Sequence, residues 1–129
     1  MRLIEGAGEF TSPGSAPNHY VEQLRVADLS VGTYSIPASG LDDQTPHSED
    51  EVYVVRSGRG RLVTDQGSVA VEPGSVVYVP AGQVHRFTDI EEDLAILVLF
   101  APAYKSRQPG AGAGGPQAGG RRAGEPQPG

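Results

Sequence analysis

Two short stretches of the sequence place histidines and a carboxylate at spacings that suit a metal ion. His47 and Glu51 lie four residues apart in the first stretch, and His85 stands in the second. The chain has no cysteine, so disulfides, thiolate metal sites, iron–sulfur clusters and cysteine nucleophiles are excluded. Two histidines and one carboxylate leave open positions on a divalent metal. We therefore expect His47, Glu51 and His85 to bind one.

A fourth metal ligand is also expected to be available near His47. Gln44, Thr45 and Glu49 are the candidates, since each lies within three residues of that histidine. If residues 47–51 are extended, Glu49 lies on the same face as His47 and Glu51, because side chains alternate along a strand.

Tyr53 and Glu49 are the candidate catalytic residues. Tyr53 lies two residues after Glu51 and so points to the same side of a strand. A phenol at that place would donate a proton or orient a substrate, and Glu49 would act as a general base.

Structural interpretations compete with these chemical ones. His47 would otherwise be a surface loop histidine, and His85 a hydrogen-bonded histidine at the start of a strand. His19 has no motif around it, so we expect it to be exposed or packed. We expect the acidic cluster to be mainly a solvated face; it consists of Asp42, Asp43, Glu49, Asp50 and Glu51.

Short apolar and β-branched runs separated by turn residues predict an all-β fold. The expected strands are residues 21–27, 29–36, 52–55, 61–64, 68–71, 75–79, 85–88 and 94–100. Glycine and proline in the intervening turns predict hairpins over 56–64 and 64–71. The apolar run 94–100 suits a helix as well, but its length and Pro102 favour a strand covered on both faces.

Length and composition predict one domain followed by a tail. The chain has 129 residues, and residues 107–129 contain eight glycines and four prolines, which predicts a disordered tail after a domain at 1–106. The net charge of −6 argues against nucleic acid as a partner. No segment is apolar enough to span a membrane, and the first residues lack the apolar run of a secretory signal, which predicts a cytoplasmic protein.

The stretch around His85 resembles the second motif of the cupin family, G-x5-P-x-G-x2-H-x3-N. Gly74, Pro80, Gly82 and His85 fall in register, and Asp89 stands where the asparagine is usual. A match at four fixed positions is more specific than any one of them.

The stretch around His47 resembles the first motif of the same family, G-x5-H-x-H-x3,4-E-x6-G. His47, Glu51 and Gly58 match its second histidine, its glutamate and its closing glycine. Thr45 occupies the place of the first histidine, and Gly40 is one residue from the place of the leading glycine. One imidazole of the usual ligand set is therefore missing.

The resemblance extends over about residues 40–100 and implies a small single-domain cupin of the RmlC-like superfamily. The implied fold is a jelly-roll β-barrel with a metal in its mouth. The implied function is a metal-dependent enzyme acting on a small oxygen-bearing organic substrate, with oxygenase-type chemistry favoured and isomerase, cyclase or decarboxylase chemistry open. Fe(II) is the first expectation for the metal, and Mn(II), Ni(II), Co(II) and Zn(II) are admissible.

A different class of function is the alternative. With one ligand missing, the chain could be a non-catalytic cupin that binds a small molecule or a metal as a sensor or storage module. The resemblance also implies a homodimer, in which residues 2–5 form a short strand that adds to the partner's sheet edge. A small molecule, and neither nucleic acid nor a membrane, is the expected further partner.

Overall fold

The computed structural model describes residues 1–106, and across them the predicted all-β fold is confirmed. The strands are β1 (His19–Val26), β2 (Leu29–Ile36), β3 (Asp50–Thr64), β4 (Gly67–Val71), β5 (Val76–Val79) and β6 (His85–Ala101). The predicted tail, residues 107–129, lies outside the described residues. In the described part, no helix has the length and apolarity that crossing a membrane requires.

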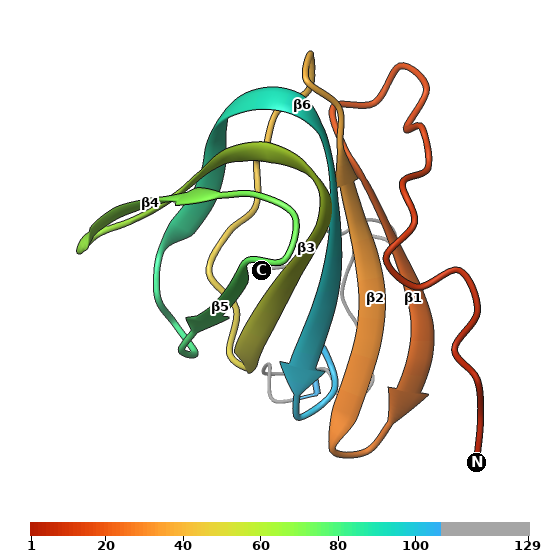
Figure 1. Ribbon diagram of the computed structural model, residues 1–129. Helices are drawn as coiled ribbons and strands as arrows, with labels where there is room; N and C mark the ends of the chain where they lie inside the picture. The colour runs from red at the N-terminus through yellow and green to blue at the C-terminus, as the bar shows by residue number, and fades with distance from the viewer. Residues whose placement is uncertain (107–129) are drawn as a thin grey trace.

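The strands form one antiparallel sheet in the order β1-β2-β6-β3-β4, with β5 also paired to β3. Strand β6 follows β3 over its whole length, while β5 and then β4 occupy the other edge of β3. Figure 1 shows β3 and β6 arching together over the upper end of the domain. This curvature gives the cupin-type jelly roll its shape, but within residues 1–106 no strand pair closes the sheet into the expected barrel.

The expected hairpin over residues 56–64 is wrong. Residues 57–60 carry turn-forming glycines, but they lie inside β3 and pair irregularly with β6. Gly58 has a φ of +90°, and a Cβ there would collide with the backbone of Asp93. The glycines therefore let β3 bend closely against β6 instead of reversing the chain.

The expected strands 85–88 and 94–100 are likewise one strand, β6, with a bulge between them. Asp89 lies in this bulge with a φ of +50°, a conformation that aspartate and asparagine adopt more readily than most residues. The predicted hairpin over 64–71 is confirmed, since Thr64 pairs with Gly67 across a two-residue turn.

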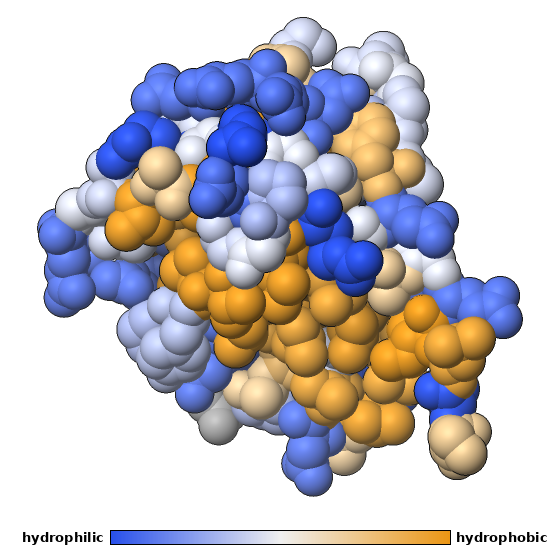
Figure 2. Space-filling view, viewed as in Figure 1, coloured by the Kyte–Doolittle hydropathy of each residue, from blue (hydrophilic) through white to orange (hydrophobic). Residues whose placement is uncertain are grey.

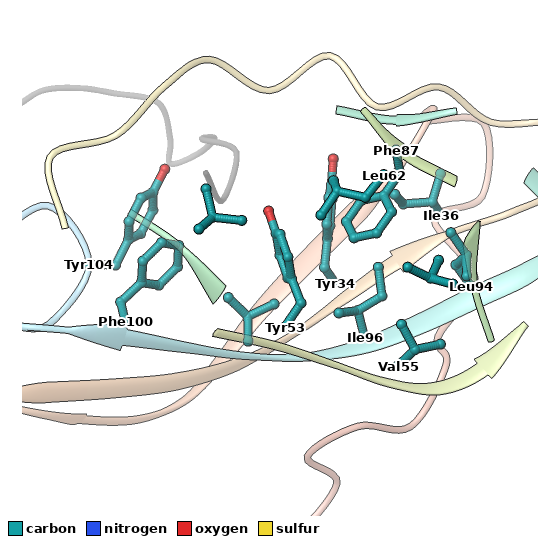
Figure 3. Packing of buried hydrophobic residues seen from close by; sticks show 13 residues of the cluster. Tyr34, Ile36, Tyr53, Val55, Leu62, Phe87, Leu94, Ile96, Phe100 and Tyr104 are labelled. Atoms are coloured by element: carbon teal, nitrogen blue, oxygen red, sulfur yellow. The ribbon is translucent and has the colours of Figure 1, made fainter. Parts of the chain in front are cut away.

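The inner face of the curved sheet holds the hydrophobic core. Alternate residues of β3 point inward, and Tyr53, Val55 and Leu62 are buried there. Figure 3 shows Tyr34 and Tyr53 side by side, with the hydroxyls of both rings directed to the same side. The core therefore carries a polar rim on one side.

The N-terminal segment covers part of the outer face of the sheet. The backbone N–H of Gly8 donates to Thr33 Oγ1 at 2.8 Å, and that of Thr11 donates to Ser35 Oγ at 3.1 Å. Residues 2–5 are not a strand in the single chain, and their expected addition to a partner's sheet edge stays a prediction. Strand β2 is thus buried on both faces along most of its length.

Candidate metal centre

Three segments bring the predicted ligands together. His47 lies in the loop before β3, Glu51 is the second residue of β3, and His85 is the first residue of β6. All three side chains are buried, and their ligand atoms lie within 4.8 Å of one another. The two side chains of the first motif and the histidine of the second motif therefore meet at one point.

Backbone hydrogen bonds hold the two motif segments against each other. The N–H of Gly82 donates to the carbonyl of His47 at 2.8 Å, and the N–H of Ala81 donates to Asp50 Oδ1 at 3.0 Å. Gly82 has a φ of +82°, which a side chain would strain. The Pro80–Gly82 turn therefore fixes the distance between the two histidine-bearing segments.

The tautomer of each histidine is set by a backbone carbonyl. His47 Nδ1 lies 2.9 Å from the carbonyl oxygen of Glu49, and His85 Nδ1 lies 2.7 Å from that of Gln83. A carbonyl oxygen only accepts, so each Nδ1 carries a proton and donates it. In a neutral imidazole this leaves the lone pair on Nε2, the arrangement usual for metal-ligating histidines.

Both Nε2 atoms face the same carboxylate oxygen. Glu51 Oε1 lies 2.5 Å from Nε2 of His47 and 3.3 Å from Nε2 of His85. Two lone pairs directed at a carboxylate repel it, so this contact requires protonated imidazoles or a cation among the three groups. Glu51 Oε2 is buried and has no hydrogen-bond partner among residues 1–106. This donor set fits a divalent cation.

The same contacts act on the basicity of His85. Burial lowers the pKa of His85, but the hydrogen bond with Glu51 and the charge of that carboxylate raise it, and the net direction is upward. The carboxylate thus attracts positive charge to the point where the three residues meet.

Tyr53 borders the centre on the inner face. Its hydroxyl donates to Gln44 Oε1 at 3.1 Å, and its oxygen lies 3.0 Å from Nε2 of His85. Burial raises the pKa of Tyr53 well above its usual value, and the negative charge of Glu51 raises it further. The phenol is therefore neutral, with its proton directed to Gln44 and its oxygen toward the histidine.

Asp42 fixes the orientation of Gln44, a role that sequence reasoning missed. Its side chain is fully buried and accepts hydrogen bonds from the Gln44 amide, from Tyr34 Oη at 2.7 Å and from the backbone N–H of Phe87 at 2.6 Å. Because the Gln44 Nε2 donates to Asp42, the Gln44 oxygen is left to accept from Tyr53. Gln44 thus belongs to a hydrogen-bond network beside the three ligands.

The other predicted residues lie in different surroundings. Thr45 is exposed, and it is outside the group formed by the three ligands. Glu49 is fully buried; its carbonyl orients His47, and its carboxylate accepts from Ser48 Oγ at 2.9 Å. His19 is half-buried at the start of β1.

The expected solvated acidic face is wrong for three of its five members. Asp42, Glu49 and Glu51 are fully buried, while Asp43 is exposed and Asp50 is half-buried. Hydrogen bonds from Tyr34, Gln44 and the Phe87 backbone replace water around Asp42. Glu49 accepts from Ser48, and Glu51 faces the two histidines.

The fold and the site together define a cupin. Residues 28–100 match the family model described as Cupin domain, so the chain belongs to the cupin family. An uncharacterized protein of Streptomyces coelicolor is 48% identical over 83 residues, which are 64% of this chain and 79% of that protein.

Solved structures with the same fold support this assignment. An RmlC-like cupin from Shewanella frigidimarina superposes with a TM-score of 0.62 at 13% identity, over 75% of this chain and 93% of that one. A structure of DMSP lyases superposes with a TM-score of 0.58 at 25% identity, over 65% of this chain and 47% of that one.

Proposed function

We propose that this protein is a metal-dependent cupin enzyme acting on a small oxygen-bearing organic molecule. One observation carries this proposal: the Nε2 atoms of both histidines face Glu51 Oε1, while both Nδ1 atoms donate to backbone carbonyls. A divalent metal bound there supplies Lewis-acid polarisation of a substrate oxygen or, as Fe(II), activation of dioxygen.

Oxygenase-type chemistry is the reaction class that we propose first. Two histidines and one carboxylate are the ligand set of non-haem Fe(II) oxygenases, and the exposed position of Thr45 adds no fourth ligand from that residue. Lyase chemistry is the second candidate, because the superposed DMSP lyases share 25% identity with this chain.

The residues around the centre have distinct proposed roles. Tyr53 orients a substrate hydroxyl by accepting its hydrogen bond, since the phenol proton is directed to Gln44. Glu49 is the proposed general base, a buried carboxylate that accepts a hydrogen bond from Ser48. Asp42 holds Gln44 and thereby the direction of the Tyr53 hydroxyl.

Oxygen uptake tests the proposal. The iron-reconstituted protein would be assayed with a panel of small carboxylic acids and phenols, beside Glu51→Gln and His19→Ala. We expect uptake with at least one compound, its loss in Glu51→Gln, and its retention in His19→Ala, which changes a histidine outside the centre. Circular dichroism would establish that both variants fold.

Two other outcomes would redirect the assignment. Elimination products from the zinc- or manganese-loaded protein, seen by NMR without oxygen uptake, would favour the lyase candidate. A protein that holds metal but turns over no compound under any condition would instead be a non-catalytic binding or storage module.

A further inference from the structure

Tyr20 has a buried hydroxyl that the site described above does not use. The Tyr20 hydroxyl oxygen is buried and has no hydrogen-bond partner among residues 1–106. Buried hydroxyls in folded proteins nearly always have a partner, so the partner of this one comes from outside the protein, as a water or a bound molecule.

The register of the sheet places this hydroxyl on the inner face. Tyr20 of β1 pairs with Tyr34 of β2, and its ring lies against Gly32, where any Cβ would collide with the hydroxyl. Gly32 pairs with Val98, which pairs with Tyr53, so the three positions form one cross-strand row. With about 4.8 Å between strands, the backbones of Gly32 and Tyr53 are roughly 10 Å apart.

A row of aromatic rings leads from Tyr20 to the metal centre. Tyr20 contacts Tyr104 edge to face, with ring centroids 6.1 Å apart, and Tyr104 stacks on Phe100 at 4.5 Å. Phe100 in turn contacts the ring of His47 at 4.9 Å. Figure 3 shows the stacked pair of Tyr104 and Phe100 beside Tyr53. This row of aromatic rings therefore begins at His47, a candidate metal ligand, and ends at Tyr20.

The charges of the interior restrict what Tyr20 can bind. No lysine or arginine is buried within residues 1–106, whereas Asp42, Glu49 and Glu51 are. Burial, followed by the charges of Glu22 and Glu51, raises the pKa of Tyr20 well above its usual value, so its hydroxyl is a neutral donor. The charge of Arg25 also acts on Tyr20, but its guanidinium is already bound to Glu22 and to the Tyr104 carbonyl. A second anionic group on the ligand would therefore have only the metal as an unpaired cation.

We propose that Tyr20 is a ligand-binding residue whose hydroxyl donates a hydrogen bond to a neutral oxygen of the molecule held at the metal centre. The inference rests on the proposed function and adds a substrate class. The substrate carries a metal-chelating oxygen group at one end and a carbonyl, ether or hydroxyl oxygen a few atoms away.

Three hydroxamates with one chelating group test this inference on the Co(II)-loaded protein. Acetohydroxamate carries the chelating end alone, N-acetylglycinehydroxamate adds a neutral carbonyl, and hexanohydroxamate has similar length without it. Visible absorption titration would give the Kd of each for wild type, Tyr20→Phe and the control Tyr78→Phe, whose ring is on the outer face.

We expect Tyr20→Phe to raise the Kd of N-acetylglycinehydroxamate about tenfold, which corresponds to the loss of one hydrogen bond. The Kd values of acetohydroxamate and hexanohydroxamate for Tyr20→Phe should stay within about twofold of the wild-type values, because neither probe reaches the hydroxyl with an oxygen. Tyr78→Phe should leave the Kd of all three probes unchanged. The Tm of the metal-free protein should not fall in Tyr20→Phe, because the hydroxyl removed has no protein partner.

Equal weakening of all three probes in Tyr20→Phe would overturn the inference and give Tyr20 a purely structural role. So would unchanged binding of N-acetylglycinehydroxamate. If wild type binds neither Co(II) nor any hydroxamate, the proposed function itself fails, a result distinct from the other two.

Discussion

Asp42 shows how single side chains prepare the centre without touching it. Its carboxylate accepts hydrogen bonds from Tyr34, from the Phe87 backbone and from Gln44, and Gln44 in turn accepts a hydrogen bond from Tyr53. Asp42 thus only accepts, which makes the Gln44 amide nitrogen the donor to it. The Gln44 oxygen is then the acceptor for the Tyr53 hydroxyl, so Asp42 sets the direction of that hydrogen bond as well.

Replacing Asp42 by asparagine tests this network. The amide of Asp42→Asn would turn one NH2 group toward the donors that the carboxylate accepts, leaving buried groups unpaired. We expect a loss of about 1–3 kcal/mol in the free energy of unfolding, measured by urea denaturation of the metal-free protein. A loss indistinguishable from zero would mean that the network does not stabilise the fold.

The pH dependence of this loss follows from the pKa of Asp42. Burial raises that pKa above its usual value of 3.8, although the hydrogen bonds oppose the shift. The native state therefore binds the proton more tightly than the unfolded state, and the stability from this group is lost as pH rises through the native pKa. The advantage of wild type over Asp42→Asn should shrink from pH 4 to pH 7; an advantage that grows would contradict the direction.

The sequence allowed some of these residues to be predicted and not others. His47, Glu51 and His85 stand at recognisable spacings, because each motif lies within one local segment. Asp42 and Tyr20 have no such signal, since their surroundings come from remote strands: Tyr34 and Phe87 around Asp42, and Gly32 beneath Tyr20.

At the scale of elements, the long strands β3 and β6 position the centre. Glu51 and His85 lie at opposite ends of this antiparallel pair, since Glu51 pairs with Phe100 and His85 with Thr64. The bend of both strands between these ends lets the two side chains meet. The sequence of residues 57–60 suits a turn, and only the partner strand decides that it bends instead. The contacts that favour the bend come from Asp93 and Leu94, more than 30 residues further along the chain.

A side chain at Gly58 or Gly74 would destabilise the fold in two ways, through the backbone conformation and through collision, and the two positions allow these to be measured separately. Both have positive φ, but only at Gly58 would a Cβ meet the backbone of Asp93; at Gly74 it would meet nothing. Gly74→Ala should cost about 1–2 kcal/mol from the backbone conformation alone. Gly58→Ala should cost at least about 1 kcal/mol more, from the collision.

Urea denaturation of the two alanine variants measures both costs. Equal losses in Gly58→Ala and Gly74→Ala would show that β6 moves away from β3 freely, and that the bend does not depend on close contact between the two strands.

At the scale of the molecule, an apolar surface lies on the outer face of the sheet, and Figure 2 shows it over β6, β3 and β5. Two cross-strand rows form it, one of Leu99, Val52 and Tyr78, the other of Leu97, Val54 and Val76. Val76 is 67% exposed and Tyr78 is 60% exposed, and the rows contain no charged residue. Uncharged apolar surfaces of this kind often mark contacts between proteins.

The homodimer expected from the sequence stays a prediction, and we place its interface on this surface. Light scattering should give a dimer at micromolar concentration, and Val76→Glu should give a monomer, because a carboxylate would be buried without a partner in the interface. Val76→Glu should leave the fold intact, since the residue is exposed in the single chain. A monomeric wild type would contradict the prediction.

The metal content of the purified protein tests the central claim most directly. The protein would be isolated without chelators or a metal-affinity column, and elemental analysis would compare wild type with His47→Ala, His85→Ala and the control His19→Ala. We predict about one equivalent of divalent metal in wild type and His19→Ala, and its loss in both other variants. Metal retained by His47→Ala and His85→Ala, or absent from wild type even after reconstitution, would contradict the account.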